Sequence, residues 1–178
     1  MTLHPWHEVD IGDKAPEIVN AVIEIPEGSQ IKYELDKKSG MIRVDRILFS
    51  AVYYPANYGF IPQTFCDDGD PLDILVICSA TVDPLCIIEA KVLGLMRMID
   101  GEEYDDKIIS VAKNDMSVNY IDNLEQLPPH TTIQLKRFFE DYKKLEHKNV
   151  IVEQFFGKDE AYKVINNSIK LYKDKFPH

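Results

Sequence analysis

The early part of the chain alternates apolar and charged residues in a way that predicts a β-hairpin. Between residues 31 and 36 every second side chain is apolar and the others are charged or polar, which is the period of a half-buried strand. A turn at residues 36–40 follows, and residues 41–47 return as the partner strand. The hairpin is therefore expected to carry one apolar and one charged face. Another strand, residues 22–25, precedes it and ends at Pro26.

Continuous apolar runs predict further strands at residues 74–78, 87–92, 95–99 and 107–112. Between the hairpin and these runs, residues 48–65 contain an aromatic residue before Pro55 and another before Gly59. Such punctuation is typical of turns and loops. We therefore expect an irregular wall of aromatic rings over residues 48–65.

Helical spacing of apolar residues predicts two helices near the end of the chain. The apolar positions of the first, which follows Pro128-Pro129, are Leu135, Phe138, Phe139, Tyr142 and Leu145. The second starts near Asp159, a suitable N-cap residue, and carries an apolar or small stripe from Ala161 to Tyr172. Strands first and helices last favour an α+β fold that is mainly β, with a closed or nearly closed barrel. A single domain over residues 1–178 is expected.

Charge and cysteine content restrict the class of partner and the compartment. The net charge of −10 argues against nucleic acid as the main partner and against an anionic membrane surface. No apolar run is long enough for a membrane span. Residues 1–18 predict an irregular arm anchored by Trp6, without the features of a secretory signal. Cys66, Cys78 and Cys86 are odd in number and form no Cys-x-x-Cys pair, so we expect reduced thiols in a cytoplasmic protein.

A turn with three carboxylates is the strongest chemical signal. Asp68, Asp70 and Asp73 lie within six residues, immediately before a predicted core strand. Like charges this close repel unless water or a cation compensates them, and Mg²⁺ favours carboxylate oxygens. A solvated acidic turn is the alternative for an isolated motif of this kind. A calcium-binding EF-hand fails on spacing, since position 5 counted from Asp68 is Leu72 and position 12 is Ser79.

A second acidic segment and a set of cations change the balance between these alternatives. The segment is predicted to be a loop between two strands and contains Asp100, Glu102, Glu103, Asp105 and Asp106. The cations are Lys32, Arg46, Lys107 and Lys143, and Glu24 and Glu34 lie on neighbouring predicted strands. Each charge alone is more often a solvated surface group. Together they are typical of a site that holds metal ions and a polyanion, as phosphoryl transfer requires.

For three tyrosines the sequence leaves open whether they serve the core or the site. Tyr142 falls on the apolar stripe of a predicted helix, which favours a core position. A phenol can nevertheless pack its ring while its hydroxyl reaches a phosphate oxygen, and the same holds for Tyr54 and Tyr58. The chain has no P-loop, no Gly-x-Ser-x-Gly elbow and no histidine spacing typical of zinc.

These residues together resemble the family I soluble inorganic pyrophosphatases of bacterial type. The segment from Asp68 to Ile74 resembles the family signature. The other matching segments, in the family's order and approximate spacing, are residues 31–37, 44–46, 54–59, 100–107 and 138–143. The resemblance extends over most of the chain, and the combination is highly specific.

The resemblance implies an OB-like five-stranded closed barrel with two C-terminal helices and a Mg²⁺-dependent hydrolase of pyrophosphate. Mn²⁺ or Zn²⁺ are possible substitutes, and a homohexamer is implied. Metal ligands would be Asp68, Asp73, Asp100 and Asp105, with Asp73 bridging two ions. Asp70 would be the general base, and Glu24, Glu34 and Tyr54 would act on metals or around them. Phosphate contacts would come from Lys32, Arg46, Tyr58, Lys107, Tyr142 and Lys143, with Tyr142 also assisting the leaving phosphate.

A non-catalytic barrel that binds metal or nucleic acid is the remaining alternative, because a barrel alone does not fix function. A nucleic-acid binder should show a basic groove with stacking aromatic rings. The net charge and the two acidic segments speak against it.

Overall fold

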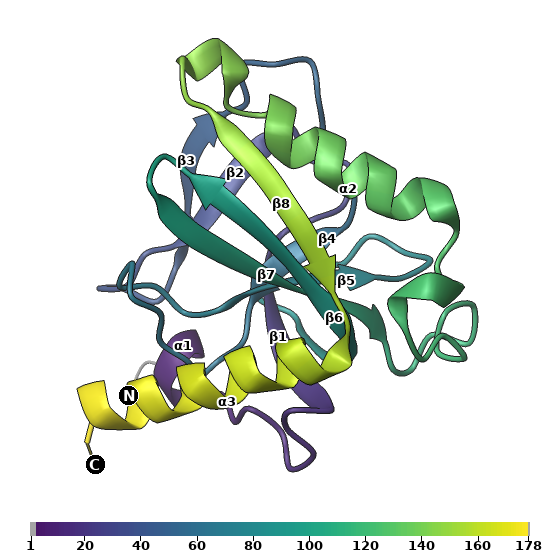
Figure 1. Cartoon of the computed structure of the whole chain (residues 1–178). Helices are drawn as coiled ribbons and strands as arrows, with labels where there is room; N and C mark the ends of the chain where they lie inside the picture. The colour runs from purple at the N-terminus through teal and green to yellow at the C-terminus, as the bar shows by residue number, and fades with distance from the viewer. Residues whose placement is uncertain (1–2, 178) are drawn as a thin grey trace.

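A closed ring of five strands forms the centre of the computed structural model, which describes residues 3–177 (Figure 1). The ring closes because β1 pairs with β4 on one side and with β6 on the other. Only the β5–β7 pair in the ring is parallel. In ring order the strands are β1 (Ile18–Ile25), β4 (Asn57–Phe60), β5 (Asp73–Ile77), β7 (Glu103–Ala112) and β6 (Ile87–Asp100). This confirms the mainly β fold and the five-stranded closed barrel.

Two further strand arrangements flank the ring. The predicted hairpin is confirmed as a separate two-stranded sheet of β2 (Ile31–Leu35) and β3 (Ile42–Ile47). Its apolar face is only partly covered, since Val44 and Ile47 are each 55% exposed. A strand that the sequence analysis did not predict, β8 (Val150–Phe156), pairs with β6 at the outside of the ring.

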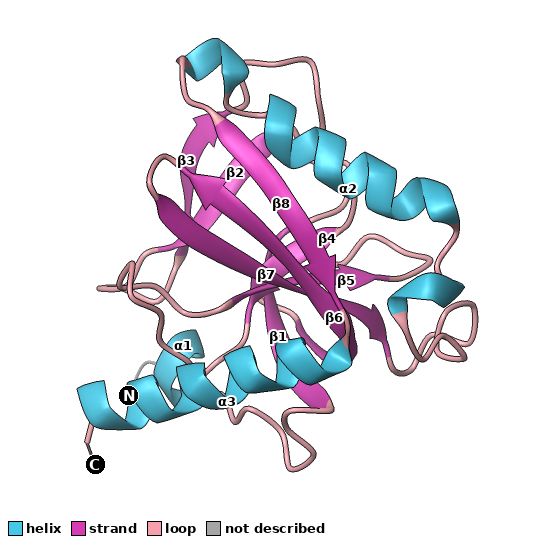
Figure 2. Cartoon of the chain, viewed as in Figure 1, coloured by secondary structure: helices cyan, strands magenta, loops and turns pink. Residues whose placement is uncertain are grey.

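Both predicted C-terminal helices are present and lie on opposite sides of the barrel (Figure 2). The first, α2 (Pro129–Asp141), runs beside β8, and the second, α3 (Lys158–Lys175), packs against β6. Short helical turns are α1 (Pro5–Glu8), η1 (Leu124–Gln126) and η2 (Lys144–Glu146). None of the helices within residues 3–177 combines the length and hydrophobicity needed to cross a membrane.

The core is divided between these two helices because successive residues of a strand face opposite sides. In β5, Leu75 belongs to the same core cluster as buried side chains of α2, such as Phe139. Its neighbours Ile74 and Val76 belong to a second core cluster, which contains buried side chains of α3 such as Ile165. The strand is buried on both faces, which explains its uninterrupted apolar sequence.

The N-terminal arm packs as predicted, with Trp6 as its anchor. Trp6 is 3% exposed, and its Nε1 donates a hydrogen bond to the Thr64 carbonyl oxygen at 2.8 Å. The arm is not wholly irregular, because α1 begins at Pro5, a residue suited to the first helical turn.

The prediction that residues 48–65 are irregular was wrong for β4. All four β4 residues are buried, so no alternation marks the strand. Gly59 permits it to lie against β1, since a Cβ there would come within 1.9 Å of the Val22 carbonyl oxygen. The glycine that suggested a turn therefore serves a close approach between two strands.

The two strands predicted at residues 87–92 and 95–99 form one strand, β6, with a register shift between Val92 and Gly94. The second acidic segment is mostly strand and not loop. Only a two-residue turn separates β6 from β7, in which Gly101 has a positive φ of 69°. Asp105 and Asp106 therefore lie on β7.

Two helix boundaries also differ from the prediction. The first helix ends at Asp141, and Leu145 lies in η2 with 61% of its side chain exposed. Gly157, and not Asp159, is the N-cap residue of α3. Asp159 instead lies in the first turn, where its negative charge interacts favourably with the positive end of the helix dipole. All three cysteines are free, as predicted.

Candidate active site

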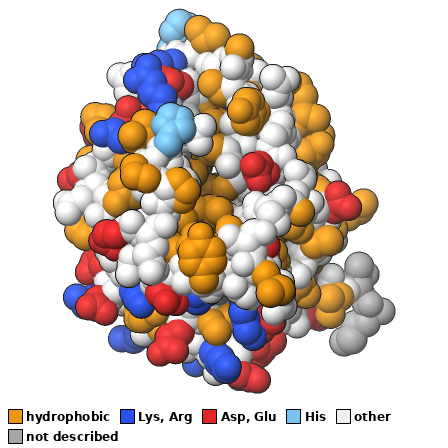
Figure 3. Space-filling model, turned by 90° about the vertical axis from the view of Figure 1, so that its right-hand side faces the viewer, with side chains coloured by type: hydrophobic (Ala, Val, Ile, Leu, Met, Phe, Trp, Pro, Cys, Tyr) orange, Lys and Arg blue, Asp and Glu red, His pale blue; other side chains and the backbone are white. Residues whose placement is uncertain are grey.

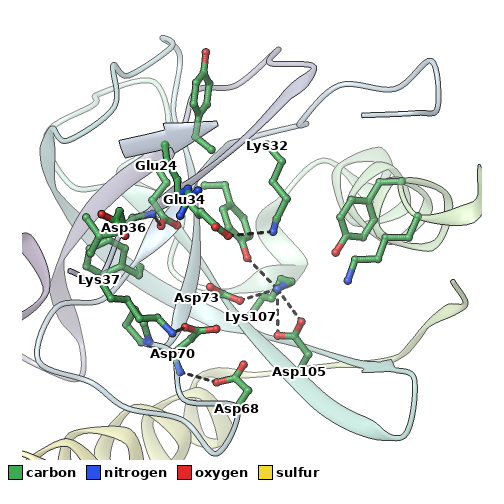
Figure 4. Close-up of a pocket in the computed structure, with 18 residues that line it drawn as sticks. Glu24, Lys32, Glu34, Asp36, Lys37, Asp68, Asp70, Asp73, Asp105 and Lys107 are labelled. Atoms are coloured by element: carbon green, nitrogen blue, oxygen red, sulfur yellow. Dashed lines mark hydrogen bonds and ion pairs between the residues drawn. The ribbon is translucent and has the colours of Figure 1, made fainter. Parts of the chain in front are cut away.

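A cavity of about 460 Å³ opens between the β2–β3 hairpin and the barrel (Figure 4). Barrel strands, the hairpin, the turn before β5 and the end of α2 all contribute side chains to it. Of the predicted site residues, those that line it are Glu24, Lys32, Glu34, Tyr58, Asp68, Asp70, Asp73, Asp105, Lys107, Tyr142 and Lys143. The fold thus brings together both acidic segments and most of the predicted cations.

Lys107 is the buried centre of this charge cluster. Parallel pairing of β5 and β7 places it beside Asp73, and Asp105 lies two residues earlier on the same strand. Its Nζ lies 2.8 Å from Asp73 Oδ2, 3.1 Å from Asp105 Oδ1 and 3.0 Å from the Tyr58 hydroxyl. Burial opposes the charge of the ammonium group, but Asp105 and Asp73 hold the pKa of Lys107 well above its usual value. The residue is therefore a permanent positive charge inside the protein.

The carboxylates around Lys107 are poorly compensated. Burial raises the pKa of Asp73 to about 6; Lys107 opposes this shift and Asp105 adds to it. Burial also raises the pKa of Asp68. Burial thus makes both carboxylates reluctant to ionise, even though Lys107 lies nearby. Additional cations in the cavity would be stabilised by them.

Glu24 is the most strongly perturbed acid of the cavity. Burial raises its pKa to about 8, even though its Oε1 accepts a hydrogen bond from the Leu35 backbone N–H at 2.7 Å. This bond crosses from β1 to β2 and joins the hairpin to the barrel. Without a bound cation, Glu24 is therefore protonated at neutral pH.

The stability of the metal-free protein should accordingly depend on pH through Glu24. The folded protein holds this proton up to about pH 8, whereas an unfolded chain releases it near pH 4.5. Because the folded state binds more protons between these values, the free energy of unfolding should fall as pH rises, by up to ~1.4 kcal/mol per pH unit from this group. Urea unfolding in EDTA should show a flatter pH profile for Glu24→Gln. Identical slopes for the variant and the parent would contradict a buried, protonated Glu24.

The turn that carries Asp68 and Asp70 is stabilised by contacts within the turn itself. Asp68 Oδ1 accepts a hydrogen bond from the Asp70 N–H at 3.0 Å, and Gly69 supplies a positive φ of 87°. The Asp70 side chain is 49% exposed and forms an ion pair with Lys37. Asp70 therefore reaches the cavity from its rim, while Asp73 lies at its floor (Figure 4).

The end of α2 supplies Tyr142 and Lys143. Tyr142 is 5% exposed, and burial raises the pKa of its hydroxyl, so that it stays protonated. The sequence left open whether this tyrosine belongs to the core or the site, and the structure places it in both. Lys143 forms an ion pair with Asp100. A predicted metal ligand is thus held by a predicted phosphate-binding residue.

Three predicted site residues do not line the cavity: Arg46, Asp100 and Tyr54. Arg46 is paired with Asp45 and, through Nε at 2.9 Å, with Glu146. Tyr54 is buried against Phe138, with ring centroids 4.7 Å apart. Their functional roles remain predictions, and in this arrangement each is engaged by a protein neighbour.

The cavity also contains charged residues to which the sequence analysis assigned no role: Asp36, Lys37 and Arg43. A signal for Arg43 was available, because it is the register partner of Glu34 across the hairpin. Lys37 ends the matching segment 31–37, but it lies in the turn after β2, where a lysine is ordinarily a solvated residue, so its type alone indicates no role.

The chemistry of the donor set fits a hard divalent cation. Carboxylate oxygens predominate, and neither histidine nor cysteine lines the cavity. Within residues 3–177 no three such side chains converge closely enough to hold a metal ion in this arrangement. Lys107 instead joins Asp73 to Asp105. The high pKa of Asp73 and of Glu24 nevertheless indicates acids that a cation would ionise.

Comparisons with known proteins agree with this geometry. The family model for inorganic pyrophosphatase matches residues 21–173. A soluble inorganic pyrophosphatase of Chlamydomonas reinhardtii is 51% identical over 97% of this chain and 90% of its own length. A relative from Solanum tuberosum is 51% identical over 98% of this chain and 83% of its own length.

Solved structures show the same relationship. The inorganic pyrophosphatase of Thermus thermophilus superposes with a TM-score of 0.92 and 38% identity, over 96% of this chain and 99% of that one. The enzyme of Helicobacter pylori gives a TM-score of 0.88 and 40% identity, over 93% and 99% of the two chains. A shared fold, a shared sequence over nearly the whole length and a cavity that combines acids with cations lead to one assignment: this chain belongs to the inorganic pyrophosphatase family.

Proposed function

We propose that this protein hydrolyses inorganic pyrophosphate to two orthophosphates in a Mg²⁺-dependent reaction, by direct attack of water. The observation that carries the proposal is the convergence of opposite charges in one cavity. Asp68, Asp73 and Asp105 lie around Lys107, and Lys32 and Lys143 lie on the walls. Pyrophosphate with its counter-cations needs both signs of charge in the same place.

The basic and phenolic side chains would hold the substrate. Lys107 keeps its charge inside the cavity, where the low dielectric strengthens attraction to a phosphate oxygen. The Tyr58 hydroxyl oxygen accepts a hydrogen bond from Lys107 Nζ, and the hydroxyl can itself donate a hydrogen bond to the same phosphate oxygen. The full set proposed for phosphate contacts is Lys32, Arg46, Tyr58, Lys107, Tyr142 and Lys143. For Arg46 this contact requires exchange of a carboxylate partner for phosphate.

The carboxylates would hold Mg²⁺, with Mn²⁺ or Zn²⁺ as substitutes. We assign Asp68, Asp73, Asp100 and Asp105 as ligands, and Glu24, Glu34 and Tyr54 to the metals or their surroundings. When bound, such ions neutralise phosphate charge and lower the pKa of water toward neutrality.

Asp70 would take the proton from the attacking water. It suits this role because its side chain is half exposed at the rim and is not engaged by Lys107. Tyr142 would assist the departing phosphate, because its protonated hydroxyl can donate a hydrogen bond. No covalent intermediate is needed.

The alternative of a nucleic-acid-binding barrel has little support. On the face shown in Figure 3, basic side chains are interspersed with acidic ones, and apolar side chains line the hollow in its middle. With a net charge of −10, such a surface does not attract a polyanionic strand.

Phosphate release from pyrophosphate tests the proposal. Purified protein should release phosphate rapidly with Mg²⁺ and none with excess EDTA, since the acids of the cavity then lack their cations. Mn²⁺ or Zn²⁺ should support a slower reaction. Ca²⁺ alone should not, because it coordinates loosely and at longer distances than Mg²⁺. Absence of release with every metal would overturn the proposed activity.

Assembly and compartment remain predictions. A homohexamer is expected, and light scattering of the purified protein would measure its mass directly. The predicted cytoplasmic location is to be tested by fractionation.

A further inference from the structure

The structure points to Lys37 as a positioning residue for Asp70, and to the N-terminal arm as the support that holds Lys37 in place. We infer that this linkage sets the catalytic rate without binding substrate. The inference rests on the proposed role of Asp70 as general base. The mechanism above uses neither Lys37 nor the arm.

Lys37 holds the Asp68–Asp70 turn at two points. Its Nζ forms an ion pair with the Asp70 carboxylate (Figure 4). It also donates a hydrogen bond to the Gly69 carbonyl oxygen at 3.2 Å. One contact fixes the side chain and the other fixes the backbone beside it. The hairpin turn and the acidic turn are thereby joined across the rim of the cavity.

The arm in turn holds the backbone of Lys37. His4 Nε2 donates a hydrogen bond to the Lys37 carbonyl oxygen at 2.9 Å, and His4 Nδ1 accepts one from the Trp6 N–H at 3.3 Å. A single tautomer, with its hydrogen on Nε2, satisfies both bonds. Next to this contact, Gly40 leaves room for the arm, since a Cβ there would lie 3.2 Å from Pro5 Cδ.

The same arm reaches the acidic turn by a second route. Trp6 Nε1 donates a hydrogen bond to the Thr64 carbonyl oxygen, and Thr64 Oγ1 accepts one from the Leu72 N–H at 2.9 Å. Thr64 is fully buried, so this connection is rigid. Residues 68–70 are therefore supported on one side through Thr64 and on the other through Lys37. A base held at both sides keeps its geometry, and small misplacements of such a group are costly in rate.

The test compares Lys37→Met with Lys37→Arg and with the matched control Lys38→Met. Lys38 is the exposed neighbour of Lys37 and does not line the cavity. Lys37→Met should lower kcat about tenfold with little change in KM, because the base is misplaced while the substrate contacts remain. Lys37→Arg should restore most of the rate, and Lys38→Met should behave like the parent. His4→Ala should lower kcat in the same direction by a smaller factor, with the melting temperature of each variant confirming that it folds.

Three outcomes would overturn the inference. The first is a kcat of Lys37→Met equal to that of Lys38→Met, and the second is a Lys37→Arg variant as slow as Lys37→Met. A raised KM with unchanged kcat would make Lys37 a substrate ligand instead of a positioning residue. Asp70→Asn, measured alongside, separates this inference from the proposal beneath it. An active Asp70→Asn variant refutes the base assignment, whereas an inactive one with a fully active Lys37→Met variant refutes only the role of Lys37.

Discussion

Replacement of Asp70 by Asn should lower kcat by ~10²–10⁴-fold and leave the fold intact, because a positioned base contributes about that much to a proton transfer. Asn keeps the size of the side chain and its carbonyl oxygen but cannot accept the proton of the attacking water. The backbone N–H of residue 70 still donates to Asp68 Oδ1, so the turn should persist. Steady-state phosphate release at saturating Mg²⁺ measures the effect.

Asp67→Asn is the matched control for this prediction. Asp67 is an exposed carboxylate on the same turn, and it does not line the cavity. Its replacement should leave kcat within a factor of about two. A titration with Mg²⁺ separates base from ligand: if a high concentration rescued Asp70→Asn, residue 70 would be a metal ligand. Turnover at the parental rate would refute the base assignment outright.

The residues of the site were largely predictable, whereas their contacts were not. The charged residues at positions 24, 32 and 34 and in the two acidic segments indicate the chemistry without knowledge of the fold. The contact between Asp73 and Lys107 depends on parallel pairing of β5 with β7, which are separated in sequence by the whole of β6. No local pattern encodes a pairing between such distant strands. For Arg46 the sequence gives the charge but not its two carboxylate partners.

The missed strands have identifiable physical causes. In β8 the burial alternates, since Val150 and Val152 are buried and Ile151 between them is 59% exposed, but the exposed residue is itself apolar, so the residue types do not alternate. In β4 every residue is buried and Gly59 mimics a turn. Conversely, the helices were predicted well, because α2 and α3 each bury one stripe and expose the other. Periodicity is informative where the exposed face of an element carries polar residues, and it fails where that face is apolar or where both faces are buried.

Replacement of Lys107 by Met should destabilise the metal-free protein by ~3–5 kcal/mol, the cost of removing one partner from a buried ion pair. Lys107 is 2% exposed and is the cation nearest to both Asp73 and Asp105. Methionine fills the space without a charge, so two half-buried carboxylates lose their partner. Urea unfolding in EDTA measures the loss, and activity should fall with it. Lys136→Met is the control: its ion pair with Glu140 is exposed, and ~0.5 kcal/mol or less is expected.

Two further conditions distinguish this electrostatic cause from a packing defect. The destabilisation should shrink as pH falls toward about 6, because Asp73 without Lys107 takes up its proton at a higher pH and then no longer needs a cation. It should also shrink on addition of Mg²⁺, which binds the folded state and compensates the same acids. A defect in packing would respond to neither. If the free energy lost by Lys107→Met were the same at pH 5 and pH 8, and the same with and without Mg²⁺, Lys107 would be a packing residue and the charge cluster would not need it.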